Sequence, residues 1–185
     1  MQPIEFAGFA ADCTIIGKMT MFGERLTDFL NGQERFRVHH VRFESLADGH
    51  EFEIDSVSIM RDELLAVVAT GPRGNEKLRV SLKSDRFQLS IGPYIILGRL
   101  HSQPGSDVMT NVLKGEAMIP LTSATIAYQA AGSTMALDVG TIIVNRHLVD
   151  WIAPTTDEET AFPDTPVRSP YGAKLIKDFT GPSTY

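Results

Sequence analysis

The chain has 185 residues, of which 43% are hydrophobic and 22% charged, with one cysteine and a net charge of −6. This composition excludes collagen, a long coiled coil and a wholly disordered chain, and the single Cys13 excludes an internal disulfide. The apolar runs are far shorter than the roughly 20 residues that span a bilayer, and the N-terminus lacks a signal-peptide pattern. We therefore expect a cytoplasmic protein without membrane insertion.

Two stretches of the chain resemble each other weakly. Residues 15–19 match residues 96–100 at a shift of 81, and residues 27–32 match residues 110–115 at a shift of 83. The second stretch then contains two additional residues, so the shift becomes 85 and Arg61 matches Arg146. Apolar residues fall on apolar residues throughout, and glycine falls on glycine three times. The pattern predicts an internal duplication.

The first copy begins with an apolar strand over residues 14–21. Gly17 inside it is typical of a bulge, a bend or a close backbone approach. A short helix over residues 24–30 has one apolar face, and Gly32 follows it where a C-cap favours positive φ.

An alternating strand follows the helix and places the adjacent His39 and His40 on opposite faces. Asp48-Gly49 then predicts a hairpin turn, which contains His50, and the last strand of the copy covers residues 64–69.

The second copy repeats this order. A strand over residues 94–101 contains a glycine, a helix over 106–113 has Ser106 or Asp107 as its N-cap, and Gly115 is the expected C-cap residue. Strands continue through residues 119–127 and a turn near 130–132, and the last strand covers residues 148–152.

The organisation is mainly β with short helices, in two tandem small barrel-like units. The units cover residues 1–70 and 85–154, joined by a bridging turn and strand at 71–84. Residues 155–185 are rich in proline and threonine and predict a flexible tail. An apolar motif in the tail either docks on a partner or folds back on its own domain; its residues are Tyr171, Leu175, Ile176 and Phe179.

The chain carries no recognisable catalytic motif. An enzymatic activity stays open as an alternative, but the sequence favours a protein that is not an enzyme. The sequence lacks the spacings of zinc and calcium sites, phosphate-binding loops and nucleophile elbows, and we expect no metal and no cofactor. Cys13 stands beside Asp12, whose carboxylate raises the pKa of a thiol, so Cys13 is interpreted as structural.

Arg61 and Arg146 occupy equivalent positions, and His147 follows the second. One interpretation is structural, with each guanidinium tying the last strands to the helix of its own copy. The other is a pocket for an anionic ligand. A separate basic segment consists of Arg73, Lys77, Arg79, Lys83 and Arg86.

Residues 144–154 resemble the last two strands of the bacterial Sm-like RNA chaperone Hfq. Arg146, His147 and Pro154 match that family's Lys, His and closing Pro, whereas Asn145 replaces an aromatic residue. Residues 17–22 are similar to the Gly-containing strand of Sm proteins. The resemblance implies small bent barrels and, with the basic segment, single-stranded RNA binding. The layout also resembles uncharacterised bacterial β-rich repeat domains.

Three functional hypotheses follow. The first is a non-enzymatic binding or assembly module that contacts a partner protein or forms a homo-oligomer through paired units and a tail. The second is an Sm-like RNA-binding protein, which the acidic balance disfavours. The third is a sensor or enzyme for a small anionic ligand, with its pocket between the two units near Arg61, Arg146 and His147.

Overall fold

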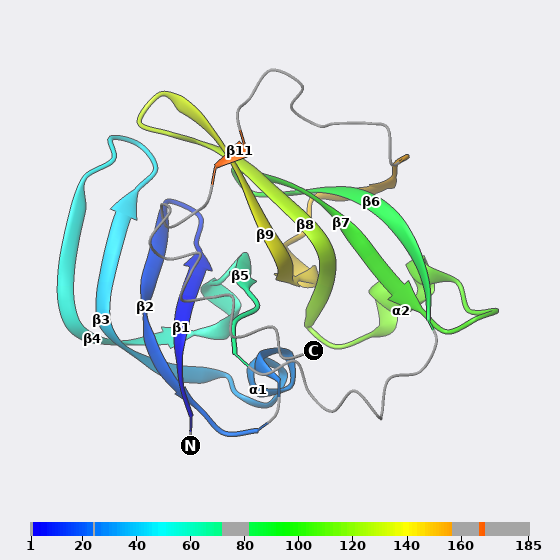
Figure 1. The fold of residues 1–185 in the computed structure, drawn as a ribbon, viewed down its shortest axis with the longest axis horizontal. Helices are drawn as coiled ribbons and strands as arrows, with labels where there is room; N and C mark the ends of the chain where they lie inside the picture. Colours follow the sequence, from blue (N-terminus) through cyan, green and yellow to red (C-terminus); the bar gives the residue numbers. More distant parts are fainter. Residues whose placement is uncertain (1, 24, 72–81, 157–166, 169–185) are drawn as a thin grey trace, which may run out of the picture.

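The computed structural model describes residues 2–23, 25–71, 82–156 and 167–168. Within these residues the fold is mainly β, as predicted, with two short α-helices. The strands form one open sheet of eleven strands within the described part of the chain, and nearly all neighbouring strands are antiparallel (Figure 1).

The elements fall into two series, which we call the first and second halves. The first half contains β1 (Gln2–Phe9), β2 (Cys13–Met21), α1 (Leu26–Gly32), β3 (Arg35–Ser45), β4 (Glu51–Met60), the 3-10 turn η1 (Arg61–Glu63) and β5 (Ala66–Val68). The second half contains β6 (Lys83–Ile91), β7 (Tyr94–Ser102), α2 (Val108–Lys114), β8 (Met118–Ala130), β9 (Ser133–Asn145), the 3-10 turn η3 (Arg146–Leu148) and β10 (Trp151–Pro154). The short β11 (Val167–Arg168) pairs in parallel with β9.

Both halves have the same strand order. It is β5-β1-β2-β3-β4 in the first half and β10-β6-β7-β8-β9 in the second. The halves are joined where β5 pairs with β9, a junction that we call the seam. The sheet stays open, and β4 and β10 are the terminal strands of its main path. The expected pair of barrel-like units is therefore replaced by one continuous open sheet.

The glycines inside β2 and β7 mark close backbone approaches, as predicted. The pairing register shifts at Gly17 against β3 and at Gly98 against β8. A Cβ on Gly17 would lie 2.6 Å from a methyl carbon of Val38, and one on Gly98 would lie 2.9 Å from the Cβ of Leu121. Both positions therefore exclude a side chain, and each lies at an irregularity that bends the sheet.

The strict alternation expected over β3 is wrong at His40, whose φ is 50°. Val38 and Val41, expected on opposite faces, are both buried, and the side chains of His39 and His40 are both exposed. Ser123 has a φ of 49° at the corresponding place in β8. The local bulge explains the difference, because one residue outside the extended conformation resets which face its neighbours occupy.

The predicted positive φ at the helix ends is also wrong. Gly32 is the last residue of α1 and Gly115 has a φ of −78°, so neither helix ends in a left-handed glycine. The strands β1 and β6 were not among the predicted elements. β1 pairs with β2 and β6 pairs with β7, so each glycine-containing strand lies between two neighbouring strands rather than at a sheet edge.

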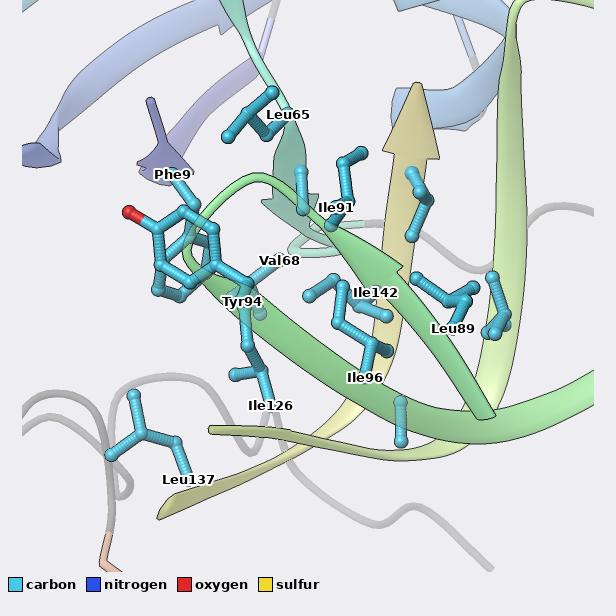
Figure 2. Close-up of a cluster of buried hydrophobic side chains, with 14 of the residues drawn as sticks. Phe9, Leu65, Val68, Leu89, Ile91, Tyr94, Ile96, Ile126, Leu137 and Ile142 are labelled. Carbon is cyan, nitrogen blue, oxygen red and sulfur yellow. The ribbon is translucent and has the colours of Figure 1, made fainter. Parts of the chain in front are cut away.

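Two buried clusters form the core, and each combines residues from both halves. In one, the rings of Phe9 and Tyr94, labelled in Figure 2, pack edge to face with each other and with the ring of Tyr128, with centroids 5.3 to 6.0 Å apart. In the other, Met118 and Ile143 of the second half pack among residues of β1, β2 and α1. The halves therefore share their hydrophobic interior, as expected for units too small to bury much surface alone.

Candidate functional site

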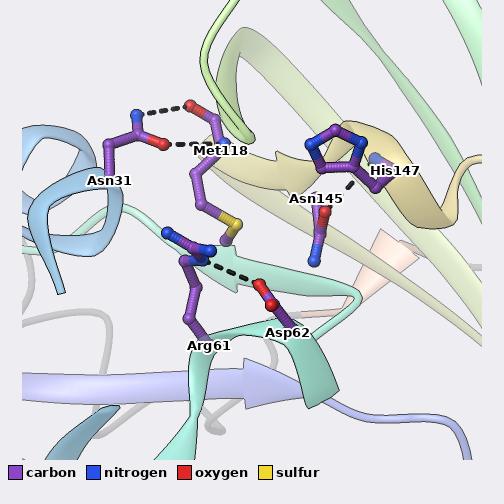
Figure 3. Close-up of polar contacts among 6 residues, drawn as sticks. All are labelled: Asn31, Arg61, Asp62, Met118, Asn145 and His147. Atoms are coloured by element: carbon purple, nitrogen blue, oxygen red, sulfur yellow. Dashed lines mark hydrogen bonds and ion pairs between the residues drawn. The ribbon is translucent and has the colours of Figure 1, made fainter. Parts of the chain in front are cut away.

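The paired arginines each have a partner within their own half. The Nε of Arg61 donates a hydrogen bond to Oδ1 of Asp62 at 2.9 Å, and the Nε of Arg146 donates to the backbone oxygen of Glu116 at 2.9 Å. Beside Arg146, the side-chain oxygen of Asn145 accepts from the backbone N–H of His147 (Figure 3). These contacts hold the turns η1 and η3, and an anionic ligand for them stays a prediction.

Most of the basic segment and all of the tail motif lie outside the described residues. This applies to Arg73, Lys77 and Arg79, and to Tyr171, Leu175, Ile176 and Phe179. Lys83 and Arg86 belong to β6. The Nζ of Lys83 lies 3.0 Å from the carboxylate of Asp85, and Arg86 is half-buried.

The thiol of Cys13 has the environment expected of a structural residue. Burial raises its pKa to about 11, followed by the hydrogen bond that the thiol donates to the Asp12 carboxylate and by the negative charge of that carboxylate. A thiol with that pKa stays protonated at neutral pH and is a poor nucleophile. Within the described residues, no three of the histidine, cysteine, aspartate and glutamate side chains gather into a possible metal site. None of the described helices is long and apolar enough to cross a membrane.

A shallow hollow lies between the end of β2 and the start of β3. It has a volume of about 350 Å³ and combines the aromatic rings of Phe22 and Phe29 with the cationic side chains of Arg35 and Arg37 and the imidazole of His39. Phe22 is 65% exposed. The hollow therefore places the exposed ring of Phe22 beside the positive charges of Arg35 and Arg37.

The terminal strands β4 and β10 present backbone groups that no described strand pairs. The N–H of Arg61 donates to Glu34, which fixes the alternation along β4 and turns the polar backbone groups of Ser58 outward. In β10 the N–H of Thr155 donates to Arg86, which turns those of Ile152 outward in the same way.

Large apolar side chains are exposed along the same two edges. On β4, Met60 is 41% exposed and Phe52 is 50% exposed, and at the start of β10 Trp151 is 45% exposed. Ile54 on β4 and Leu148 in η3 are exposed as well. Sequence reasoning missed these residues, because whether an apolar side chain ends up buried depends on which strand lies beside it.

No protein-family model, curated protein or solved structure matches this chain.

Proposed function

We propose that this chain is a non-enzymatic binding and assembly module that joins protein partners by strand addition at β4 and β10. The observation that carries the proposal is the open sheet, whose two terminal strands combine outward backbone groups with exposed apolar side chains. The outward backbone groups of an edge strand are a template for another strand.

Strand addition divides the work of recognition between two kinds of group. Backbone hydrogen bonds along the edge supply affinity, and side chains on alternate positions supply specificity. On β4 the outward backbone groups of Ser58 would accept the incoming strand, with Met60 and Phe52 beside it.

We also propose that the chain arose by duplication of one small unit. The shared strand order, the glycine bulges at Gly17 and Gly98 and the positive φ of His40 and Ser123 support this. The unit boundaries expected from the sequence, at residues 1–70 and 85–154, are part of this proposal. The resemblance of residues 144–154 and 17–22 to strands of Sm-like domains is part of this proposal of a duplicated unit.

The experiment is purification of the tagged chain from its own cells in three forms: wild type, Ser58→Pro and Ser58→Ala. Proline removes the outward N–H at an exposed edge position and leaves the inner ladder with β3 untouched, whereas alanine keeps that N–H. The proposal predicts partners that accompany the wild type and the alanine variant and are lost with proline. Equal recovery with all three forms would count against binding at β4.

A second candidate is RNA binding, which the hollow beside Phe22 favours. Exposed aromatic rings stack on unpaired bases, and Arg35 and Arg37 would contact the phosphates. The test is titration of a fluorescent uridine-rich oligonucleotide at low and high salt. Binding that weakens with salt and is lost in Arg37→Ala supports this candidate, and no binding at low salt excludes it.

A further inference from the structure

The seam is the one place where the described structure shows how these strand edges pair. The strand β5 pairs with β9 in an antiparallel register that sets Ala66 opposite Val144, Val67 opposite Ile143 and Val68 opposite Ile142. The backbone N–H of Asn145 donates to Leu65, and that of Ala69 donates to Thr141, both at 2.9 Å.

The two strands that meet at the seam have counterparts in the two terminal strands. The strand β10 follows η3 and pairs with β6 as β5 follows η1 and pairs with β1. The strand β4 pairs with β3 as β9 pairs with β8. Within the described residues, each terminal strand therefore corresponds to one strand of the seam and has no neighbour on its outer side.

The register of the seam can be transferred to the terminal strands residue by residue. At the shift of 85 that matches Arg61 to Arg146, Val68 corresponds to Ala153 and Ile142 corresponds to Val57. Transferred in this way, Ala153 lies opposite Val57, and Ile152 lies opposite Ser58. The outward backbone groups of Ser58 and Ile152 then form a hydrogen-bonded pair.

Side chains that are buried at the seam have exposed counterparts on the terminal strands, as expected if the terminal strands lack the partner that the seam has. Ala66 is fully buried at the seam, and its counterpart Trp151 is 45% exposed. Asn145 is 1% exposed, and its counterpart Met60 is 41% exposed. A second molecule in the same register would cover both exposed side chains.

We propose that copies of this chain associate head to tail, with β10 of one molecule paired to β4 of the next in the register of the seam. This inference rests on the proposed function and names the partner as a second copy. Because the contact joins two different surfaces, repetition gives a closed ring or an open filament rather than a two-fold dimer.

Two differences make the contact between molecules weaker than the seam. Pro154 stands where Ala69 donates a hydrogen bond at the seam, and proline has no N–H to donate. At the seam, Asn31 of α1 also bonds to both backbone groups of Met118, with both distances at 2.9 Å. The counterparts of these two residues are Lys114 and Arg35, and the lysine side chain can donate a hydrogen bond but cannot accept one from a backbone N–H. We therefore expect the association to be reversible.

The first test is disulfide trapping in the full chain with Cys13 replaced by alanine. Two single-cysteine proteins of different mass, Val57→Cys and Ala153→Cys, are mixed and oxidised gently. The expected product is the mixed 57–153 dimer. The matched control, Ser58→Cys with Ala153→Cys, places the thiols on opposite faces and is expected to give little of it. A predominance of 57–57 or 153–153 dimers would overturn the head-to-tail arrangement.

The second test leaves the packed residues of the strands unchanged. Lys114→Asn restores the amide that Asn31 supplies at the seam, and we expect it to tighten self-association on the order of tenfold. Light scattering over a range of concentrations measures this effect. If the wild type and Lys114→Asn are both strict monomers, the inference is wrong.

The two proposals fail in different ways. If the chain is monomeric and another protein co-purifies with the wild type but not with Ser58→Pro, the pairing of copies is wrong and strand addition at β4 is supported. A monomeric chain whose recovered proteins are unchanged by Ser58→Pro overturns both proposals at β4.

Discussion

The side-chain amide of Asn31 donates to the backbone oxygen of Met118 and accepts from its N–H, so that α1 of one half is hydrogen-bonded to β8 of the other. Both groups of Met118 are partly buried, and each would lose its partner in Asn31→Ala. We expect that variant to lower the free energy of unfolding by about 1–3 kcal/mol in urea denaturation. Gln33→Ala, at the exposed residue that follows α1, is the control and should stay within about 0.5 kcal/mol of the wild type.

The close approach at Gly17 predicts a large cost for a single added methyl group. A Cβ there would lie 2.6 Å from Val38 and 2.9 Å from the backbone oxygen of His39, and the backbone atom has little freedom to move. Gly17→Ala should therefore destabilise the fold by about 1–3 kcal/mol. Gly32→Ala is the matched control, because nothing lies within 4 Å of its Cβ. It should be neutral or slightly stabilising, and equal losses in the two variants would contradict the packing explanation.

Stability should fall in alkaline solution. Burial raises the pKa of Cys13 from 9.0 to about 11 and that of Tyr128 from 10.0 to about 12. Burial, followed by the charge of Tyr128, also raises the pKa of Tyr94. The folded chain therefore keeps protons that the unfolded chain releases, and the free energy of unfolding decreases as the pH rises above about 9. Below that pH these groups contribute no slope.

Urea midpoints measured between pH 7 and pH 11 test this expectation. Tyr94→Phe removes one of the three groups, so its midpoint should fall less steeply above pH 10 than that of the wild type. The same variant loses the hydrogen bond from the Tyr94 hydroxyl to the backbone oxygen of Ala10, which lowers its stability at neutral pH. A midpoint of the wild type that stays flat to pH 11 would contradict the prediction.

The two helices differ in how they begin. Asp107 caps α2 by accepting hydrogen bonds from the backbone N–H groups of Met109 and Thr110, whereas Arg25 at the start of α1 makes no side-chain cap. Asp107→Ala should lower the melting temperature, and Arg25→Ser should raise it. Hydrogen bonds, first from the Thr110 hydroxyl, lower the pKa of Asp107. The difference between Asp107→Ala and the wild type should therefore shrink as the pH falls below about 4.

Local chemistry made part of the fold predictable from the sequence. A glycine inside an apolar strand indicated the bulges at Gly17 and Gly98, and Asp48-Gly49 indicated a hairpin turn in which Gly49 has a φ of 71°. Asp107 was correctly placed as an N-cap candidate. Each of these signals depends on a few adjacent residues and their backbone preferences.

The pairing of distant strands was not predictable in the same way. At the seam β9 has the continuous apolar run Ile142-Ile143-Val144, where β4 has Val57-Ser58-Ile59, yet an apolar run does not by itself say which distant strand pairs with it. The exposed Met60 and Trp151 follow from that choice, so they could not be recognised as edge residues in advance. The proposed roles of Arg61 and Arg146 stay predictions, and the hydrogen bond that each Nε donates stays within its own half.

The unlike ends of the sheet give the molecule a direction. An array of copies linked through them would expose β4 at one extremity and β10 at the other, so the two extremities would grow and bind differently. A protein that offered only one such edge would terminate growth from one side, and its abundance would set the length of the array. If copies pair as proposed, growth would therefore be directional, with a separate terminator for each end.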